Sequence, residues 1–139
     1  PKPSLHKLLK KAGRGVLRLT VDLAEPQHKI LADEPDILWI MGWNYIPGAD
    51  NAAFGRKVIL QRTDGAGYLA VPTDWHRADV EAILPTENRI GLAGFVLRLR
   101  REELSQGEYR VGMLAETEAV SETEPGMSFV DWSDCMLTV

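Results

Sequence analysis

Cysteine and long apolar runs are scarce or missing in this 139-residue chain, and each absence excludes a class of protein. Cys135 is the only cysteine, so no disulfide can form within the chain, which favours a reducing compartment. No apolar run approaches the roughly 20 residues that span a bilayer, and no signal peptide is visible. We therefore expect no membrane insertion and a location in the cytoplasm or at the cytoplasmic face of the cell envelope.

An excess of positive charge is also absent. The chain has 16 Lys and Arg against 20 Asp and Glu, which gives a net charge of -4. Phosphate backbones are bound through a positive field, so we expect no nucleic-acid partner. The length suits one domain with a core of its own. Because the chain begins at Pro1 rather than at methionine, we expect a module of a larger protein.

Motifs for catalysis and metal binding are missing as well. His6, His28 and His76 are far apart, and none has a second ligand at metal spacing. The sequence has no Ser/His/Asp signature and no glycine-rich phosphate loop, because no helical pattern follows the Gly65–Gly67 turn. Glu102 and its neighbour suit a solvated surface better than a pair of catalytic carboxylates. We expect no catalytic residue, no metal and no cofactor.

The chain does have an alternation of apolar and polar residues with a period of two, which is typical of half-buried strands. The expected strands cover residues 16–23, 37–45, 56–62, 68–71, 94–100, 107–115 and 136–139. Asp64-Gly65 predicts a hairpin turn. This pattern predicts an all-β fold, an antiparallel immunoglobulin-like sandwich of about seven or eight strands over residues 16–139. We expect a short amphipathic helix or flexible linker within residues 1–15, and an exposed acidic loop over residues 116–126.

Glycines lie beside or near aromatic residues in three of these strands, in Gly42-Trp43, Gly94-Phe95 and the segment 107–112. Aromatic residues favour a pleated surface, and glycine allows close approach. We expect Trp43, Phe95 and Tyr109 to point into the core of the sandwich. Trp39 shares a strand face with Trp43, and we expect both in the core rather than on a ligand-binding platform.

The same segments, in the same order, resemble the accessory β-sandwich modules of bacterial surface-glycan proteins. The resemblance rests on Leu19–Asp22, Ile40–Trp43, Arg77–Val80, Gly94-Phe95 and Gly107–Gly112. Such modules are joined to glycosyltransferases or teichoic-acid-type polymerases. The resemblance implies a non-catalytic domain beside a sugar-transferring enzyme and carries over no catalytic residue. The basic N-terminal segment and the acidic loop depart from it.

The densest chemical cluster runs from Asp74 to Asp79. An aromatic ring beside carboxylate, imidazole and guanidinium groups is typical of surfaces that bind sugars, so Trp75, His76, Arg77 and Asp79 are the candidate ligand-binding residues. A second interpretation is structural: Arg77 and Asp79 form an ion pair that fixes a loop, and Trp75 caps the edge of the sandwich.

Two functions follow from these patterns. The first is a non-catalytic accessory module for scaffolding, oligomerisation or positioning of a catalytic domain in glycan assembly. The second is a carbohydrate-binding domain that uses the loop from Trp75 to Asp79. We expect Cys135 to be a small buried residue, whereas Trp132 suits either an exposed loop or a packed edge.

Overall fold

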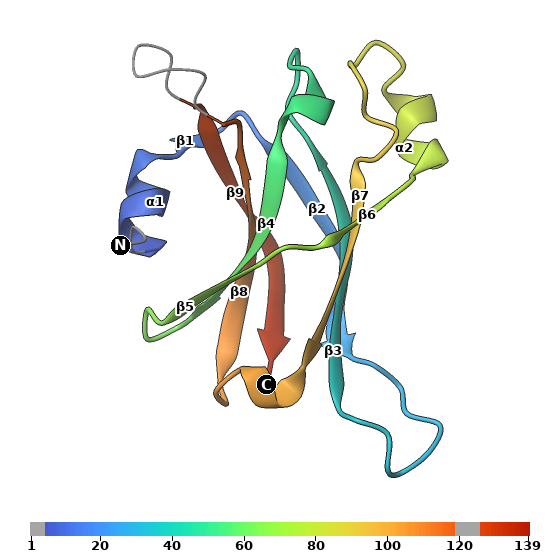
Figure 1. The fold of residues 1–139 in the computed structure, drawn as a ribbon, viewed down its shortest axis with the longest axis vertical. Coiled ribbons are helices and arrows are strands. Elements are labelled where there is room, and N and C mark those ends of the chain that lie inside the picture. Colours follow the sequence, from blue (N-terminus) through green and yellow to red (C-terminus); the bar gives the residue numbers. More distant parts are fainter. Residues whose placement is uncertain (1–4, 119–125) are drawn as a thin grey trace.

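The computed structural model describes residues 5–118 and 126–139, which form two facing β-sheets (Figure 1). The four-stranded sheet has the order β2 (Arg18–Pro26), β3 (Ile37–Tyr45), β7 (Gly94–Arg100), β6 (Thr73–Trp75). The five-stranded sheet has the order β1 (Gly13–Arg14), β9 (Ser128–Thr138), β8 (Glu108–Glu116), β4 (Gly55–Arg62), β5 (Gly67–Ala70). Among these strands only the β1–β9 pair is parallel. The expected all-β architecture of antiparallel strands is therefore confirmed at this level.

The main core lies between the two sheets and is formed by every second residue of the central strands. Leu38 and Ile40 of β3 face Val58 and Leu60 of β4 across the sandwich, and all four are fully buried. Phe95 and Tyr109 belong to this core as expected. Two of the three aromatic residues assigned to the core from their glycine neighbours are therefore correctly placed.

The glycine of the pair Gly42-Trp43 is needed for contacts with neighbouring strands and not for contact with Trp43. Its Cα faces the core, and an added Cβ would collide with the Thr20 carbonyl oxygen of β2 and would lie 3.0 Å from the tip of the Phe95 ring. Gly42 is paired directly with Phe95 in the β3–β7 ladder. The glycine thus makes room for the backbone of β2 and for the ring of Phe95 on β7, rather than for its own neighbour, Trp43.

Trp39 and Trp43 do not lie between the sheets, so their expected position in the core is wrong. They alternate with Leu38 and Ile40 along β3 and therefore point to the outer face of the four-stranded sheet. Trp43 packs under the helix α2 (Ala78–Ile83), in a separate cluster with Val80. One apolar face of β3 thus packs in the sandwich core, and part of the other face is covered by a short helix. The alternation of residues in the sequence cannot show which face is which.

The N-terminal helix α1 (Leu5–Lys11) covers the outer face of the other sheet (Figure 1). Leu9 and Ala12 are buried against side chains of the five-stranded sheet, namely Ile59, Leu114 and Val130. Trp132 packs at the margin of this cluster, where the Arg110 guanidinium lies 4.1 Å from the centroid of its ring. The expected helix is present, and Trp132 takes the packed one of its two expected positions.

Several boundaries differ from expectation. The last strand begins at Ser128 rather than at residue 136, and the short edge strand β6 lies where an irregular loop was expected. The β4–β5 hairpin is confirmed, with Gly65 at a φ of 99° and Asp64 Oδ1 accepting a hydrogen bond from the Ala66 amide. Of the expected acidic loop, residues 119–125 lie outside the described part of the chain.

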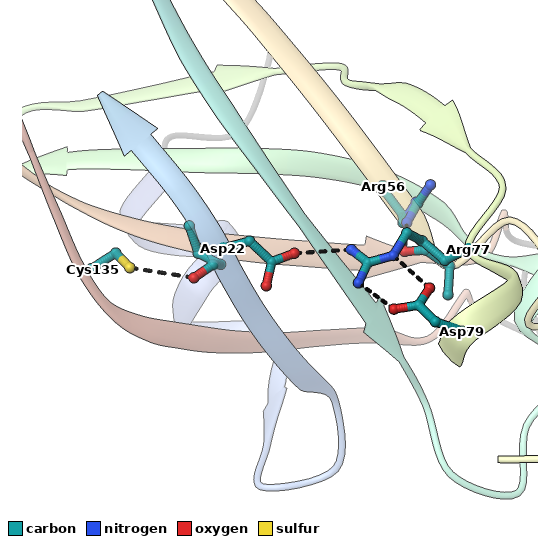
Figure 2. Close-up of polar contacts among 7 residues, drawn as sticks. Asp22, Arg56, Arg77, Asp79 and Cys135 are labelled. Carbon is teal, nitrogen blue, oxygen red and sulfur yellow. Dashed lines mark hydrogen bonds and ion pairs between the residues drawn. The ribbon is translucent and has the colours of Figure 1, made fainter. Parts of the chain in front are cut away.

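β2 and β9 lie beside each other without forming a ladder, and side chains of β9 bridge them. Asp131 Oδ2 accepts a hydrogen bond from the Leu19 amide at 3.0 Å. The thiol of Cys135 donates to the Val21 carbonyl at 3.5 Å, and Cys135 is half-buried rather than buried (Figure 2). No helix within the described residues has the length and apolar character needed to cross a membrane.

Candidate functional site

The segment from Trp75 to Asp79 leaves the end of β6 and enters α2. Trp75 is 52% exposed and is paired with Gly94 of β7. His76 is exposed, and its Nε2 lies 3.9 Å from Glu81 Oε1. The four candidate residues are therefore contiguous on the surface, but they do not converge on one point.

Arg77 is held by two carboxylates (Figure 2). Its Nε and Nη2 donate to the two oxygens of Asp79 at 2.9 and 2.8 Å, and its Nη1 donates to Asp22 Oδ2 at 2.9 Å. The pair with Asp79 has the bidentate geometry that fixes a guanidinium in one orientation. The ion pair that the structural interpretation expects between Arg77 and Asp79 is therefore present.

Asp22 is the partner that the sequence analysis missed. It lies 55 residues before Arg77, at an irregularity in the β2–β3 register between Val21 and Leu23. Asp22 is the residue at which the register shifts, and its side chain reaches Arg77 on the outer face of the sheet. The alternation of β2 predicts that Asp22 points outward, but no local signal in the sequence links it to Arg77.

The ion pair changes the acid–base character of both groups. Hydrogen bonds from Arg77 lower the pKa of Asp79 to about 2, and the two carboxylates raise the pKa of Arg77. Both groups therefore stay charged over the range in which general acids and bases exchange protons. Their chemistry suits fixation of the loop rather than proton transfer.

The Arg77 side chain crosses the sheet over Gly94, which has no side chain to block it. A Cβ on Gly94 would collide with Cγ of Arg77 and would lie 2.7 Å from the Trp75 carbonyl oxygen. Gly94 stands between Trp43 and Trp75 in the β3–β7–β6 register. The arginine stem thus crosses the outer face over this glycine and reaches Asp22 on the far strand.

Trp75 borders a shallow cavity of about 320 Å³ on the outer face of the four-stranded sheet. The cavity is also lined by Val71, Thr73, Val96 and Arg98. Of the four candidate residues, Trp75 alone lines it. The surface of this cavity presents an aromatic ring, a hydroxyl and a guanidinium, and Arg77 and Asp79 are not part of its lining.

The described residues contain no group of three metal-ligating side chains. No family model, curated protein or solved structure matches the chain. The fold and the residues of the surface around Trp75 are therefore the basis for any functional inference.

Proposed function

We propose that the chain is an immunoglobulin-like accessory module of a bacterial glycan-assembly protein, without catalytic activity of its own. In immunoglobulin-type domains, the first, second, fifth and fourth strands form one sheet, and the third, sixth and seventh form the other. With β2 taken as the first strand and β5 as an additional strand after the third, the orders β2-β3-β7-β6 and β9-β8-β4-β5 fit this arrangement.

A tyrosine near the start of β8 also supports the immunoglobulin-like assignment. Tyr109 donates a hydrogen bond from its hydroxyl to the Ser105 carbonyl at 2.7 Å. A tyrosine at the corresponding corner of immunoglobulin domains bonds in the same way to backbone a few residues upstream, two residues before a cysteine. Here the residue two positions later is the buried Val111, so apolar packing stands in place of a disulfide.

The exposed apolar surface along the edge strand β6 is the observation that carries the accessory role. Val71 is 74% exposed and Trp75 is 52% exposed. Both line the cavity of about 320 Å³, and β6 has a neighbouring strand on one side only. An apolar surface beside an open sheet edge suits a protein interface, because a partner buries the side chains and pairs the free backbone groups.

The second candidate function is carbohydrate binding at this surface. A half-exposed indole beside Thr73 and Arg98 can stack on the apolar face of a pyranose while the polar groups bond its hydroxyls. In this interpretation the ion pairs of Arg77 hold the loop that supports Trp75, and Trp75 itself contacts the sugar.

Sedimentation and fluorescence measurements on the same variants separate the two functions. For the accessory role, we expect concentration-dependent association in analytical ultracentrifugation that Trp75→Glu abolishes and Leu31→Ala, at another exposed apolar position, leaves intact. For carbohydrate binding, we expect bacterial cell-wall polysaccharide fragments to change the tryptophan fluorescence of the native chain but not of Trp75→Phe. A monomeric chain with no fluorescence response would contradict both self-association and carbohydrate binding at this surface.

A further inference from the structure

A second cavity, of about 350 Å³, lies at the end of the sandwich where the β3–β4 connection meets the segment before β7. It is separate from the surface around Trp75, because Asp74 lines this cavity and Trp75 lines the other. The volume is near the lower end of the range of about 300–1,000 Å³ found for small-molecule sites. It suits one small ring rather than a nucleotide or a peptide.

Asn44 provides a hydrogen-bond donor to this cavity. The side chain is 6% exposed, and its Oδ1 accepts from Arg56 Nη1 at 2.8 Å. Because arginine only donates, this contact fixes which end of the amide is oxygen. Trp39 Nε1 is the one described side-chain nitrogen or oxygen that is both buried and unpaired, so Nδ2 of Asn44 keeps some accessible surface. Asn44 lines the cavity, and its Nδ2 has no acceptor among the described residues.

Arg56 and Asp74 add a rigid acceptor. The side chain of Arg56 is 10% exposed, and its Nη2 bonds to Asp74 Oδ1 at 2.6 Å and to the Gly94 carbonyl at 3.0 Å. The second carboxylate oxygen of Asp74 has no hydrogen bond to a described residue and remains available as an acceptor. The site thus combines a fixed amide donor with a fixed carboxylate acceptor.

Charge and wall composition narrow the class of ligand. The two arginines at the cavity are each paired with a carboxylate, Arg56 with Asp74 and Arg89 with Asp50 at 2.9 Å. The balanced charges favour neither an anion nor a cation. Ile46 and Phe54 supply an apolar wall. Arg89 also has a φ of 50°, a strained backbone of a kind that clusters at ligand sites.

We propose that this cavity binds a neutral sugar ring, with Asn44 Nδ2 donating to one hydroxyl and Asp74 accepting from another. The apolar wall covers the C–H face of the ring. This site goes beyond the surface assigned to the proposed function, since neither Asn44 nor Phe54 lines that surface. A ligand with so few atoms binds with a Kd on the order of 1 mM.

Nuclear magnetic resonance titration of the whole chain tests the site. The probes are the methyl glycosides of glucose, galactose and N-acetylglucosamine, with inorganic phosphate as a charged comparison. We expect at least one glycoside to shift the Asn44 side-chain amide signal saturably. Ala52→Trp should fill the mouth of the cavity from an exposed position and weaken binding at least tenfold, while Ala53→Trp, one residue further and outside the lining, should leave it unchanged.

Asn44→Asp gives a second variant that keeps an acceptor for Arg56 and removes the amide donor, so it should also lose binding, and circular dichroism checks that the variant is folded. Trp75→Ala should leave the Kd unchanged, and this separates the cavity from the surface of the proposed function. Three results would overturn the site: no saturable shift with any glycoside, unchanged binding in Ala52→Trp and Asn44→Asp, or binding of phosphate alone.

Discussion

At the scale of single residues, Gly94 provides the space that the Arg77 side chain occupies beside Trp75. Its missing side chain lets the Arg77 stem cross the outer face between Trp43 and Trp75. The carboxylates of Asp22 and Asp79 then hold the guanidinium from two elements. The position of Trp75 on the surface therefore depends on a glycine that makes no polar contact itself.

Gly94→Ala is expected to destabilise the protein by about 1–3 kcal/mol, because overpacking at a closed site forces backbone to move. The added Cβ meets the Trp75 carbonyl at 2.7 Å and cannot be accommodated by a side-chain rotation alone. Gly55→Ala is the matched control, since its Cβ would have only an ordinary contact of 3.7 Å with the Glu116 carbonyl. Urea unfolding of both variants measures the difference, and equal losses would refute the crossing of Arg77 over Gly94.

The ion pair of Asp79 predicts a dependence of stability on pH. The hydrogen bonds from Arg77 lower the pKa of Asp79 from its usual value of 3.8 to about 2 in the folded protein. A lowered pKa means that the contribution to stability is present above the unfolded value and is lost as the pH falls through about 2. We therefore expect the native chain to lose more stability than Asp79→Asn between about pH 5 and about pH 2.

Thermal melting of both chains across this range measures the difference. The pKa of Asp64 is also lowered to about 2, through its hydrogen bond from Arg62, and it changes both chains alike. A nuclear magnetic resonance titration of the Asp79 carboxyl gives a direct reading. A value near 3.8 would show that Arg77 does not hold this carboxylate in solution.

At the scale of elements, Arg56 ties β4 to the opposite sheet. Its guanidinium donates to Asn44 of β3, to the Ala93 carbonyl at 2.7 Å and to the Gly94 carbonyl of β7. It also lies 5.9 Å from the centroid of the Phe95 ring. These contacts of Arg56 join the two sheets and add to the apolar core. No disulfide can do so, because the chain has a single cysteine.

Arg56→Met is expected to cost about 3 kcal/mol, because it removes the hydrogen bonds of a largely buried guanidinium to Asn44 and to two backbone carbonyls, and it removes the partner of Asp74. Lys57→Met is the control on the same strand. Its ion pair with Glu116 is partly exposed, and we expect a loss of less than about 1 kcal/mol. Denaturant unfolding at one pH compares the two variants. Equal losses would mean that the contacts of Arg56 add no more than a surface pair.

The sequence predicts elements better than it predicts which elements meet. The alternation in residues 94–100 and 107–115 is local, so both strands and the burial of Phe95 and Tyr109 follow from it. The outer position of Trp43 does not follow, because a strand with two apolar faces gives no sign of which face meets the second sheet. Contacts between distant segments, such as Asp22 with Arg77, depend on the bulge and on strand order.

The candidate site shows the same limit. The cluster from Trp75 to Asp79 is visible in the sequence, and its ion pair is one of the two interpretations that the residue types allow. The cavity at Asn44 is not visible, because its walls come from four separate segments. Asn44 occupies an inward position in a strand, where the pattern expects an apolar residue, and this was the one local signal that could have revealed it.

At the scale of the whole molecule, each sheet has an outer face that is partly covered by a short helix. α1 covers the five-stranded sheet through Leu9 and Ala12, and α2 covers one end of the four-stranded sheet through Val80. The part of the four-stranded sheet around Trp75 remains exposed. The edge of β6 is therefore one apolar surface that the two helices leave uncovered.

The packing of α1 makes a prediction about the folding unit. Leu9 is 8% exposed and contacts the five-stranded sheet, so Leu9→Ala is expected to cost about 2–3 kcal/mol, as for other buried leucines. Lys10→Ala, at an exposed position of the same helix, should change stability by less than about 0.5 kcal/mol. Denaturant unfolding followed by both fluorescence and circular dichroism measures these losses. A helix that acted only as a linker would give the same stability for both variants, because its loss would leave the sandwich unchanged.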